Sequence, residues 1–221
     1  MSLAGLDVGM SRTVILALLI FLFIEPSIVI GAEPIQRDHV RELDKVFTPQ
    51  TSAANLIELF GEANVTTEQI YLGEGSYEEG TVLFKNSDEE KVEILWKDPR
   101  SKQFPRIVMI RGKASRWRTT RRLTLGLDLL TVEKLNRRPF RLLGFAWDYE
   151  GSVLSWSGGS LEVQGADSCT VGARLRPEEQ VIDGMRLYYK QVAGDREFSS
   201  GHPAMQALNP RVYMVVLHWK R

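Results

Sequence analysis

The chain has 221 residues, of which 43% are apolar and 25% are charged, as in an ordinary globular protein with a substantial core. Its single cysteine, Cys169, excludes an intramolecular disulfide and a cysteine-rich zinc site. The formal net charge is zero, yet residues 33–112 hold 15 acidic and 10 basic side chains and residues 113–221 hold 11 and 17. This asymmetry predicts that the two halves attract each other or are simply well solvated.

A hydrophobic leader opens the chain. Residues 13–24 (TVILALLIFLFI) carry no charge and follow Arg12. The run is shorter than the roughly 20 apolar residues that a membrane span needs, so it favours a signal peptide over residues 1–32, with Ala32 at a plausible cleavage point. An uncleaved N-terminal membrane anchor is the alternative. We expect an exported protein of the periplasm or cell surface, which an uncleaved leader would hold at the membrane.

The residues after the leader predict a polar spacer and then a helix with a series of strands. Residues 33–47 are charged and polar, which is typical of a spacer or a short surface helix. Thr51 or Ser52 can cap a helix that runs to Gly61, a residue suited to a left-handed stop. Runs rich in β-branched and aromatic residues then predict strands over residues 69–73, 80–85, 91–96 and 106–110.

A similar order of elements follows a connector over residues 113–122. A helix is predicted over residues 127–136, and strands over residues 140–146, 152–156, 160–163 and 211–218. The run Pro105–Met109 (PRIVM) also matches Pro210–Met214 (PRVYM). We therefore expect one α+β domain over residues 48–221, built from two repeated helix-plus-antiparallel-sheet halves (48–112 and 123–221). The second half carries an insertion over residues 164–209, with a helix or strand at 181–189.

Several runs resemble a family of uncharacterised exported bacterial proteins. They are residues 59–65 (LFGEANV), 80–84 (GTVLF), 94–98 (ILWKD), 123–126 (LTLG), 133–136 (EKLN) and 144–149 (GFAWDY). The order of helix, glycine and antiparallel meander is more distantly similar to the β-lactamase-inhibitor-protein fold and to the small outer-membrane assembly lipoprotein domain called SmpA/OmlA. These resemblances imply a non-catalytic protein-binding module. The chain lacks the lipobox cysteine of the lipoprotein group, which puts outer-membrane anchoring in doubt.

The sequence carries no recognisable catalytic or metal-binding motif. His39, His202 and His218 lack the spacing of metal ligands, and nucleophile-elbow and phosphate-loop patterns are absent. Cys169 has no histidine near it in the sequence, so we interpret it as structural. We predict neither metal nor cofactor and no enzymatic activity. The alternative is an envelope hydrolase that uses Asp148, a carboxylate flanked by Trp147 and Tyr149 that could act as an acid.

The most unusual run is residues 111–122 (RGKASRWRTTRR), which holds six basic residues, no acid and one tryptophan. Basic residues around an aromatic ring suit a contact surface, although a solvated connector that complements the acidic first half is the alternative. The binding residues that we predict are Arg116, Trp117, Arg118, Arg121 and Arg122, together with Trp147 and Tyr149. The expected partner is an envelope protein, with an anionic lipid or glycan as the alternative and no nucleic acid.

Overall fold

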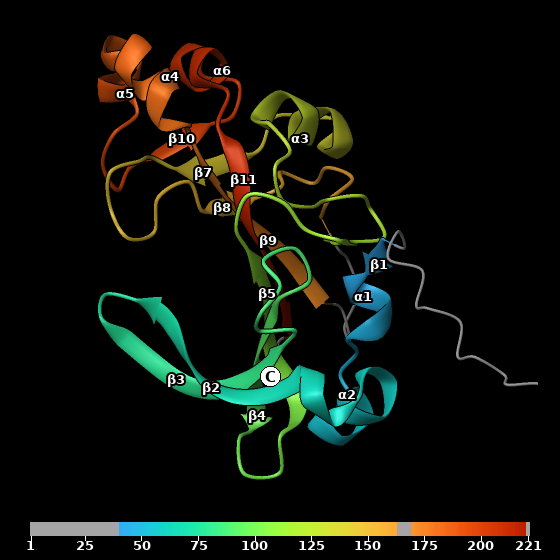
Figure 1. Cartoon of the computed structure of the whole chain (residues 1–221). Coiled ribbons are helices and arrows are strands. Elements are labelled where there is room, and N and C mark those ends of the chain that lie inside the picture. The colour runs from blue at the N-terminus through green and yellow to red at the C-terminus, as the bar shows by residue number, and fades with distance from the viewer. Residues whose placement is uncertain (1–39, 163–168, 220–221) are drawn as a thin grey trace, which may run out of the picture. The chain divides into compact units, whose positions relative to one another are not determined.

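The computed structural model describes residues 40–162 and 169–219, so the predicted leader and the first part of the predicted spacer, residues 33–39, lie outside the described residues. Helices and antiparallel sheets make up the described part, which confirms the α+β class (Figure 1). No helix within these two ranges is both long and apolar enough to cross a membrane.

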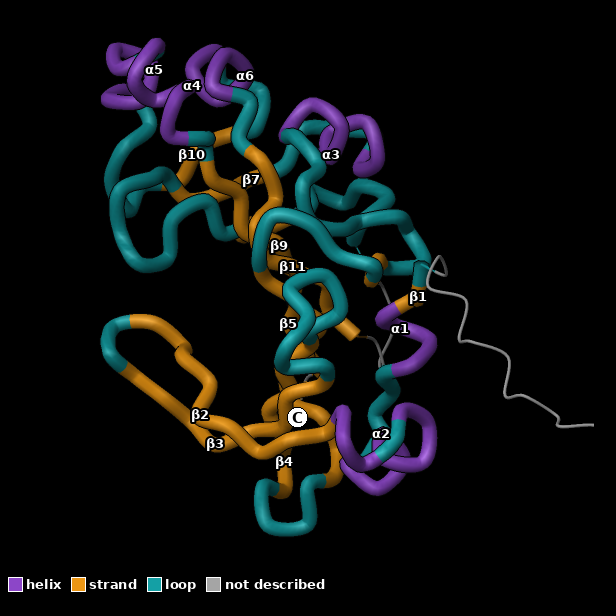
Figure 2. The backbone as a smooth tube through the Cα atoms, viewed as in Figure 1, coloured by secondary structure: helices purple, strands orange, loops and turns teal. Residues whose placement is uncertain are grey.

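A six-stranded antiparallel sheet forms the centre of the domain (Figure 2). Its spatial order is β2 (Val65–Gly73), β3 (Ser76–Leu83), β4 (Val92–Asp98), β5 (Gln103–Arg111), β11 (Arg211–Trp219) and β9 (Cys169–Arg176). The strands β5 and β11, which are distant in the sequence, pair with each other from His218 opposite Ile107 to Met214 opposite Arg111. The first four strands thus share a sheet with two strands from the end of the chain.

Two smaller sheets flank this one. The strands β10 (Glu197–Ser199), β7 (Arg141–Leu143) and β8 (Val153–Ser155) form the first, and β1 (Arg41–Glu42) pairs in parallel with β6 (Trp117–Arg118) in the second. An antiparallel bridge between Ser152 and Arg174 joins β8 to β9. Beside this bridge, a Cβ atom at Gly151 would lie 1.7 Å from the carbonyl oxygen of Leu175, so only glycine permits this close approach.

The described residues form six α-helices. They are α1 (Leu43–Val46), α2 (Ala53–Phe60), α3 (Leu129–Asn136), α4 (Glu179–Gly184), α5 (Arg186–Gln191) and α6 (Pro203–Leu208), with a 3-10 turn at Glu62–Asn64. Ser52 and Asn55 form a capping box at the start of α2, and Gly61 ends it with a φ of 84°. Asp128 caps α3 by accepting a hydrogen bond from the Thr131 N–H. Both helices confirm the sequence predictions.

The main core covers one face of the large sheet. Val108 and Ile110 of β5 and Val215 of β11 are buried there in one cluster with Leu56 of α2 and Leu129 of α3. The opposite face carries only a small separate apolar cluster, formed by Ile70, Val82, Leu95 and Met109. That second face is therefore not covered by the helices of the main core.

Two predictions about the chain's organisation are wrong. Residues 160 and 161 lie in a turn rather than in a strand, and the strand that follows β8 is β9, inside the segment we treated as an insertion. The predicted spacer is also part of the domain at its end, because Leu43 and Phe47 are fully buried in the core. Apolar side chains spaced among charged residues were enough to anchor this segment.

The buried side chain of Asn136 ties the end of α3 to the turn after β8. Its Nδ2 donates to the carbonyls of Trp156 and Arg138, each at 2.9 Å, and its Oδ1 accepts from the Leu161 N–H at 3.1 Å. We expect Asn136→Ala to lower the free energy of unfolding by about 2–4 kcal/mol, because it leaves buried backbone polar groups without a hydrogen-bond partner. Urea denaturation measures this change.

Asn64→Ala is the matched control. Asn64 makes one exposed hydrogen bond, from Nδ2 to the Phe60 carbonyl, so its loss should cost less than about 1 kcal/mol. Equal losses in the two variants would contradict a structural role for the Asn136 network.

Candidate binding site

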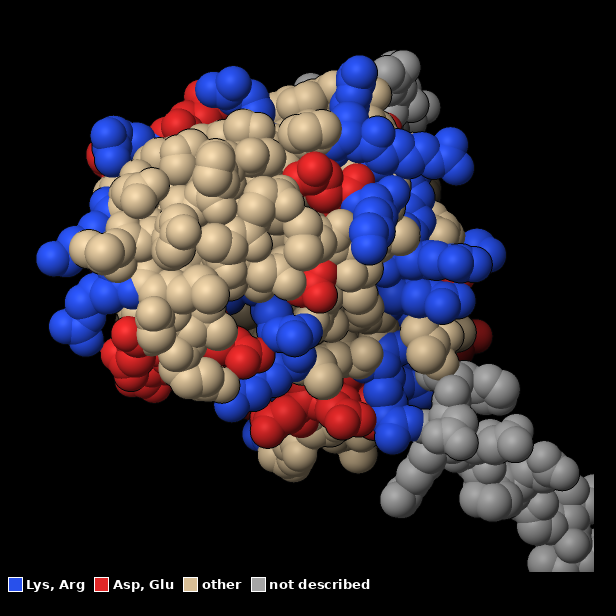
Figure 3. Space-filling model, turned by 90° about the horizontal axis from the view of Figure 1, so that it is seen from above, with Lys and Arg blue, Asp and Glu red and all other residues tan. Residues whose placement is uncertain are grey.

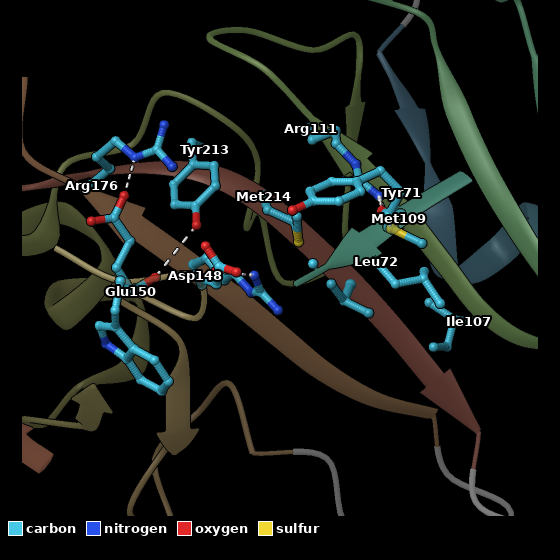
Figure 4. A pocket seen from close by; sticks show the side chains of 14 residues that line it. Tyr71, Leu72, Ile107, Met109, Arg111, Asp148, Glu150, Arg176, Tyr213 and Met214 are labelled. Carbon is cyan, nitrogen blue, oxygen red and sulfur yellow. Dashed lines mark hydrogen bonds and ion pairs between the residues drawn. The ribbon is translucent and has the colours of Figure 1, made fainter. Parts of the chain in front are cut away.

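The face of the large sheet that lies opposite the main core contains a hollow of about 630 Å³ (Figure 4). Strands β2, β5, β9 and β11 and the loop between β7 and β8 all contribute to it. Its lining consists of Tyr71, Leu72, Gly73, Ile107, Met109, Arg111, Trp147, Asp148, Glu150, Arg174, Arg176, Tyr213, Met214 and Val216. Aromatic, basic and thioether side chains therefore meet at one place.

Strand alternation places an apolar floor in the hollow. In β5, Ile107 and Met109 face the hollow, whereas Val108 between them is buried in the main core. From the neighbouring strand β11, Met214 and Val216 complete this floor. Methionine adapts its shape to whatever contacts it, so such a floor suits a binding surface.

A group of charged and aromatic residues occupies one end of the hollow. Arg176 forms an ion pair with Glu150, and its guanidinium lies 4.3 Å from the centre of the Tyr213 ring (Figure 4). The second carboxylate oxygen of Glu150 accepts the Ala146 N–H at 3.0 Å. Both oxygens of Glu150 are thus engaged, which holds the loop between β7 and β8 against β9.

At the other end of the hollow, Arg111 contacts residues of both β4 and β2. Its Nε lies 2.7 Å from a carboxylate oxygen of Glu93, a residue that is only 7% exposed. One of its terminal nitrogens donates to the Tyr71 carbonyl at 3.0 Å. Because Tyr71 belongs to β2, Arg111 fastens the β2–β3 hairpin over the sheet face. The ring of Tyr71 packs at a tilt against the exposed Tyr77 of β3, with ring centres 5.2 Å apart.

The tip of the β2–β3 hairpin touches the loop between β7 and β8. The Glu74 N–H donates to Oδ2 of Asp148 at 3.1 Å, and Gly73 lies beside the Tyr149 ring. Arg174 donates to the Asp148 carbonyl at 3.2 Å and lies 5.1 Å from the centre of the Tyr149 ring. The predicted residues Trp147 and Tyr149 therefore belong to this site: Trp147 lines the hollow and packs edge-on against Tyr149.

The five predicted connector residues do not line the hollow. Trp117 is fully buried, packs against Phe47 and Phe60, and donates its ring N–H to the Glu90 carbonyl at 2.8 Å. Its ring is therefore part of the core, which corrects the prediction that it contacts a ligand. Arg41 lies 5.4 Å from the centre of the Trp117 ring and forms an ion pair with Glu90 at 2.9 Å.

Three connector arginines are engaged within the domain. Arg116 lies 3.2 Å from a carboxylate oxygen of Glu89, and Arg118 lies 3.7 Å from one of Glu42. Arg121 donates to the carbonyls of Ser160 and Glu162. These contacts favour the alternative that the connector complements the acidic first half. Basic side chains do gather at the surface on the side where Figure 1 places α3, as Figure 3 shows.

Sequence reasoning missed Arg174, Arg176, Tyr213 and Met214. A signal for the two arginines was present in residues 169–176 (CTVGARLR), where Val171, Ala173 and Leu175 are buried and alternate with the residues that face outward. Their alternation predicts a strand with one open face. In β5 the alternation of buried and outward-facing residues was hidden, because apolar residues lie on both faces of the strand and form one continuous apolar run.

Neither a group of metal ligands nor a reactive thiol is found in the described part of the chain. Within residues 40–162 and 169–219, no group of three His, Cys, Asp or Glu side chains could hold a metal ion. Burial raises the pKa of the Cys169 thiol to about 12, so the thiol stays protonated at neutral pH. A protonated thiol is a poor nucleophile and a poor metal ligand.

The connector should behave as a structural element in a mutational test. We expect Trp117→Ala to lower the free energy of unfolding by about 3–5 kcal/mol, because it empties a large buried volume. Arg122→Ala, at an exposed connector residue, should change it by less than about 0.5 kcal/mol. Denaturant unfolding of both variants checks this, and a small effect of Trp117→Ala would contradict the assignment of its ring to the core.

The raised pKa of Cys169 has a direct chemical consequence. At pH 8 the folded thiol is almost entirely protonated, whereas an unfolded thiol with a pKa near 8.5 ionises appreciably. We expect an aromatic disulfide reagent to modify the native protein about a thousandfold more slowly than the urea-unfolded protein. Equal rates in the two states would show that the thiol is not shielded.

Comparisons with known proteins add no relative. No family model matches the chain, and no curated protein and no solved structure is significantly similar to it. The resemblances drawn from its sequence runs therefore stay predictions, and the function must be argued from the site itself.

Proposed function

We propose that this chain is an exported, non-catalytic binding module of the bacterial envelope, which captures a partner protein on the open face of its large sheet. The observation that carries this proposal is the hollow of about 630 Å³, where tyrosine, tryptophan, arginine and methionine side chains meet. These residue types are enriched at protein interfaces and supply much of their binding energy. The hydrophobic leader supports export.

An internal duplication fits this proposal. Each half runs from a helix into a series of strands: α2 precedes β2, β3, β4 and β5, and α3 precedes β7, β8, β9, β10 and β11, with α4 and α5 before β10 and α6 before β11. The last strands of the two halves pair at the sheet centre, where Ile110 lies opposite Val215. Both residues stand five positions after a proline, Pro105 in one case and Pro210 in the other. An approximate two-fold axis through this pair would relate the halves.

The geometry supports hydrolysis less well than binding. Asp148 and Glu150 both line the hollow, as a pair of catalytic carboxylates would require. Glu150, however, binds Arg176 with one oxygen and the Ala146 N–H with the other. Asp148 is exposed and accepts the Glu74 N–H. Both carboxylates are therefore engaged in contacts within the domain.

Binding of an anionic lipid or glycan through the connector is also less well supported. Such a surface needs free cationic groups, and Arg116 and Arg118 already face carboxylates of Glu89 and Glu42. Arg121 is occupied by two backbone carbonyls. Of the connector arginines we predicted, Arg122 alone is exposed and has a side chain that forms neither a hydrogen bond nor an ion pair with the described residues.

Site-specific photo-crosslinking tests the proposed function. A photoreactive amino acid at Tyr77, beside the hollow, should cross-link to a partner in intact envelopes. The same group at Leu59 of α2 serves as the control, because the two side chains are almost equally exposed, at 62% and 64%. Adducts from position 77 alone are expected. No adducts, or identical adducts from both positions, would contradict a binding surface on the sheet face.

A further inference from the structure

Strand β2 forms an open edge of the large sheet. It pairs with β3 from Val65 opposite Leu83 to Gly73 opposite Ser76. Figure 2 shows the two strands curving together away from the centre of the sheet. In the part of the chain that the structure describes, no other strand pairs with β2, so one whole side of this nine-residue strand is open.

The hydrogen bonds of the β2–β3 hairpin show which backbone groups of β2 point outward. The Asn64 carbonyl accepts the Phe84 N–H at 2.9 Å, so the residues of β2 that bond to β3 are those in step with Asn64. The N–H and C=O groups of the alternate residues point to the open side. The outward-facing residues are Val65, Thr67, Gln69 and Tyr71. The Tyr71 carbonyl agrees with this, because it accepts a hydrogen bond from Arg111, which lies outside the hairpin.

This edge lacks the features by which proteins commonly prevent strands from pairing. Lys and Pro, two residue types that protect an edge, are absent from β2 (VTTEQIYLG). Its β-bulge lies at the far end, between Tyr71 and Gly73. Its one charged residue, Glu68, forms an ion pair with Lys85 at 3.1 Å. An open row of backbone donors and acceptors on a strand of this length is a template for another strand.

A second copy of β2 matches this edge. Two antiparallel β2 strands overlap along their full length when the middle residue, Gln69, lies opposite Gln69 of the second copy. Thr67 then faces Tyr71, and a β-branched residue opposite an aromatic ring is a favourable cross-strand pair. Glu68 faces Ile70, so like charges do not lie directly opposite each other. One strand thus provides both sides of a compatible pair.

Charge disfavours the neighbouring registers. With Glu68 at the centre, two carboxylates would lie directly opposite each other. With Thr67 at the centre, two Lys102 side chains would approach each other, because the Lys102 ammonium donates to Oγ1 of Thr67 at 2.5 Å. The register centred on Gln69 avoids both contacts.

We propose that the chain forms a homodimer in which the β2 edges of two copies pair antiparallel about Gln69 and join the two large sheets into one. The two-fold axis stands perpendicular to the joined sheet at this residue. Both open faces consequently point to the same side, and the dimer presents two hollows to a partner. The inference goes beyond the proposed function, for which one copy is enough.

Disulfide trapping of the full chain in envelopes tests this inference. In Gln69→Cys, the two thiols lie across a hydrogen-bonded residue pair whose Cα atoms are about 5.5 Å apart, a separation that a disulfide spans. We expect mild oxidation to give a covalent dimer on a non-reducing gel, above the background of the wild type with its Cys169.

Glu79→Cys is the matched control. Glu79 is exposed like Gln69 and lies opposite it on β3. In the dimer its two copies are three strand spacings apart, about 14 Å, which is too far for a disulfide. Absence of a dimer from position 69, or equal trapping at positions 69 and 79, would overturn the inference.

A proline at position 69 distinguishes backbone pairing from a side-chain contact. Gln69→Pro removes an outward N–H and leaves the hydrogen bonds between β2 and β3 in place, so the variant should fold, as thermal unfolding checks. The association of two differently tagged full chains in mild detergent should weaken about tenfold or more. Gln69→Ala keeps the N–H and should associate like the wild type.

Unchanged association of a folded Gln69→Pro variant would contradict pairing through β2. The cross-links to a partner from position 77 do not depend on these outcomes, so the dimer and the proposed function can fail separately.

Discussion

The pairing of β5 with β11 is the constraint on which the rest of the structure depends. It joins a strand near the middle of the sequence to the last strand of the chain and makes one continuous sheet. Because side chains alternate along each strand, the pairing decides which residues enter the core and which face the hollow on the open side of the sheet. A slip of one residue would bury Arg111 among the core residues and expose Ile110, so the apolar core enforces the geometry of the hollow.

The ion pair between Arg111 and Glu93 is the second contact on which the shape of the open sheet face depends. A carboxylate that is only 7% exposed loses much of its hydration, and such a pair contributes little net stability. Its contribution is rather to geometry: Arg111 also binds the Tyr71 carbonyl, so one guanidinium positions both β4 and the hairpin of β2 and β3. The small apolar cluster around Ile70 and Met109 then fills the space beneath the hairpin. Polar and apolar contacts together give the open face its curvature and its hollow.

Local signals predicted the parts of this fold that local chemistry decides. The cap at Ser52 and the stop at Gly61 set the bounds of α2, and the helix predicted over residues 127–136 is α3, whose start Asp128 caps. The strand β9 escaped prediction, because we treated its segment as an insertion although its alternation was visible.

The candidate site was also predicted only in part, because local runs of sequence reveal only those site residues that are neighbours in the chain. Trp147 and Tyr149 share a short run with Asp148 and were found, whereas Arg111, Arg174 and Tyr213 meet only through long-range strand pairing, which no single run of sequence displays.

The arginines of the chain show why composition alone misplaces a binding surface. The connector has the densest basic run, and yet Arg116 and Arg118 face acidic side chains of the first half. Arg174 stands in a run with a lower density of charge, and its neighbours are an aromatic ring and a backbone carbonyl. A cation is available to a ligand when its surroundings hold it in place without neutralising it. By that criterion the open face of the sheet, rather than the basic connector, is the surface on which this chain is equipped to bind.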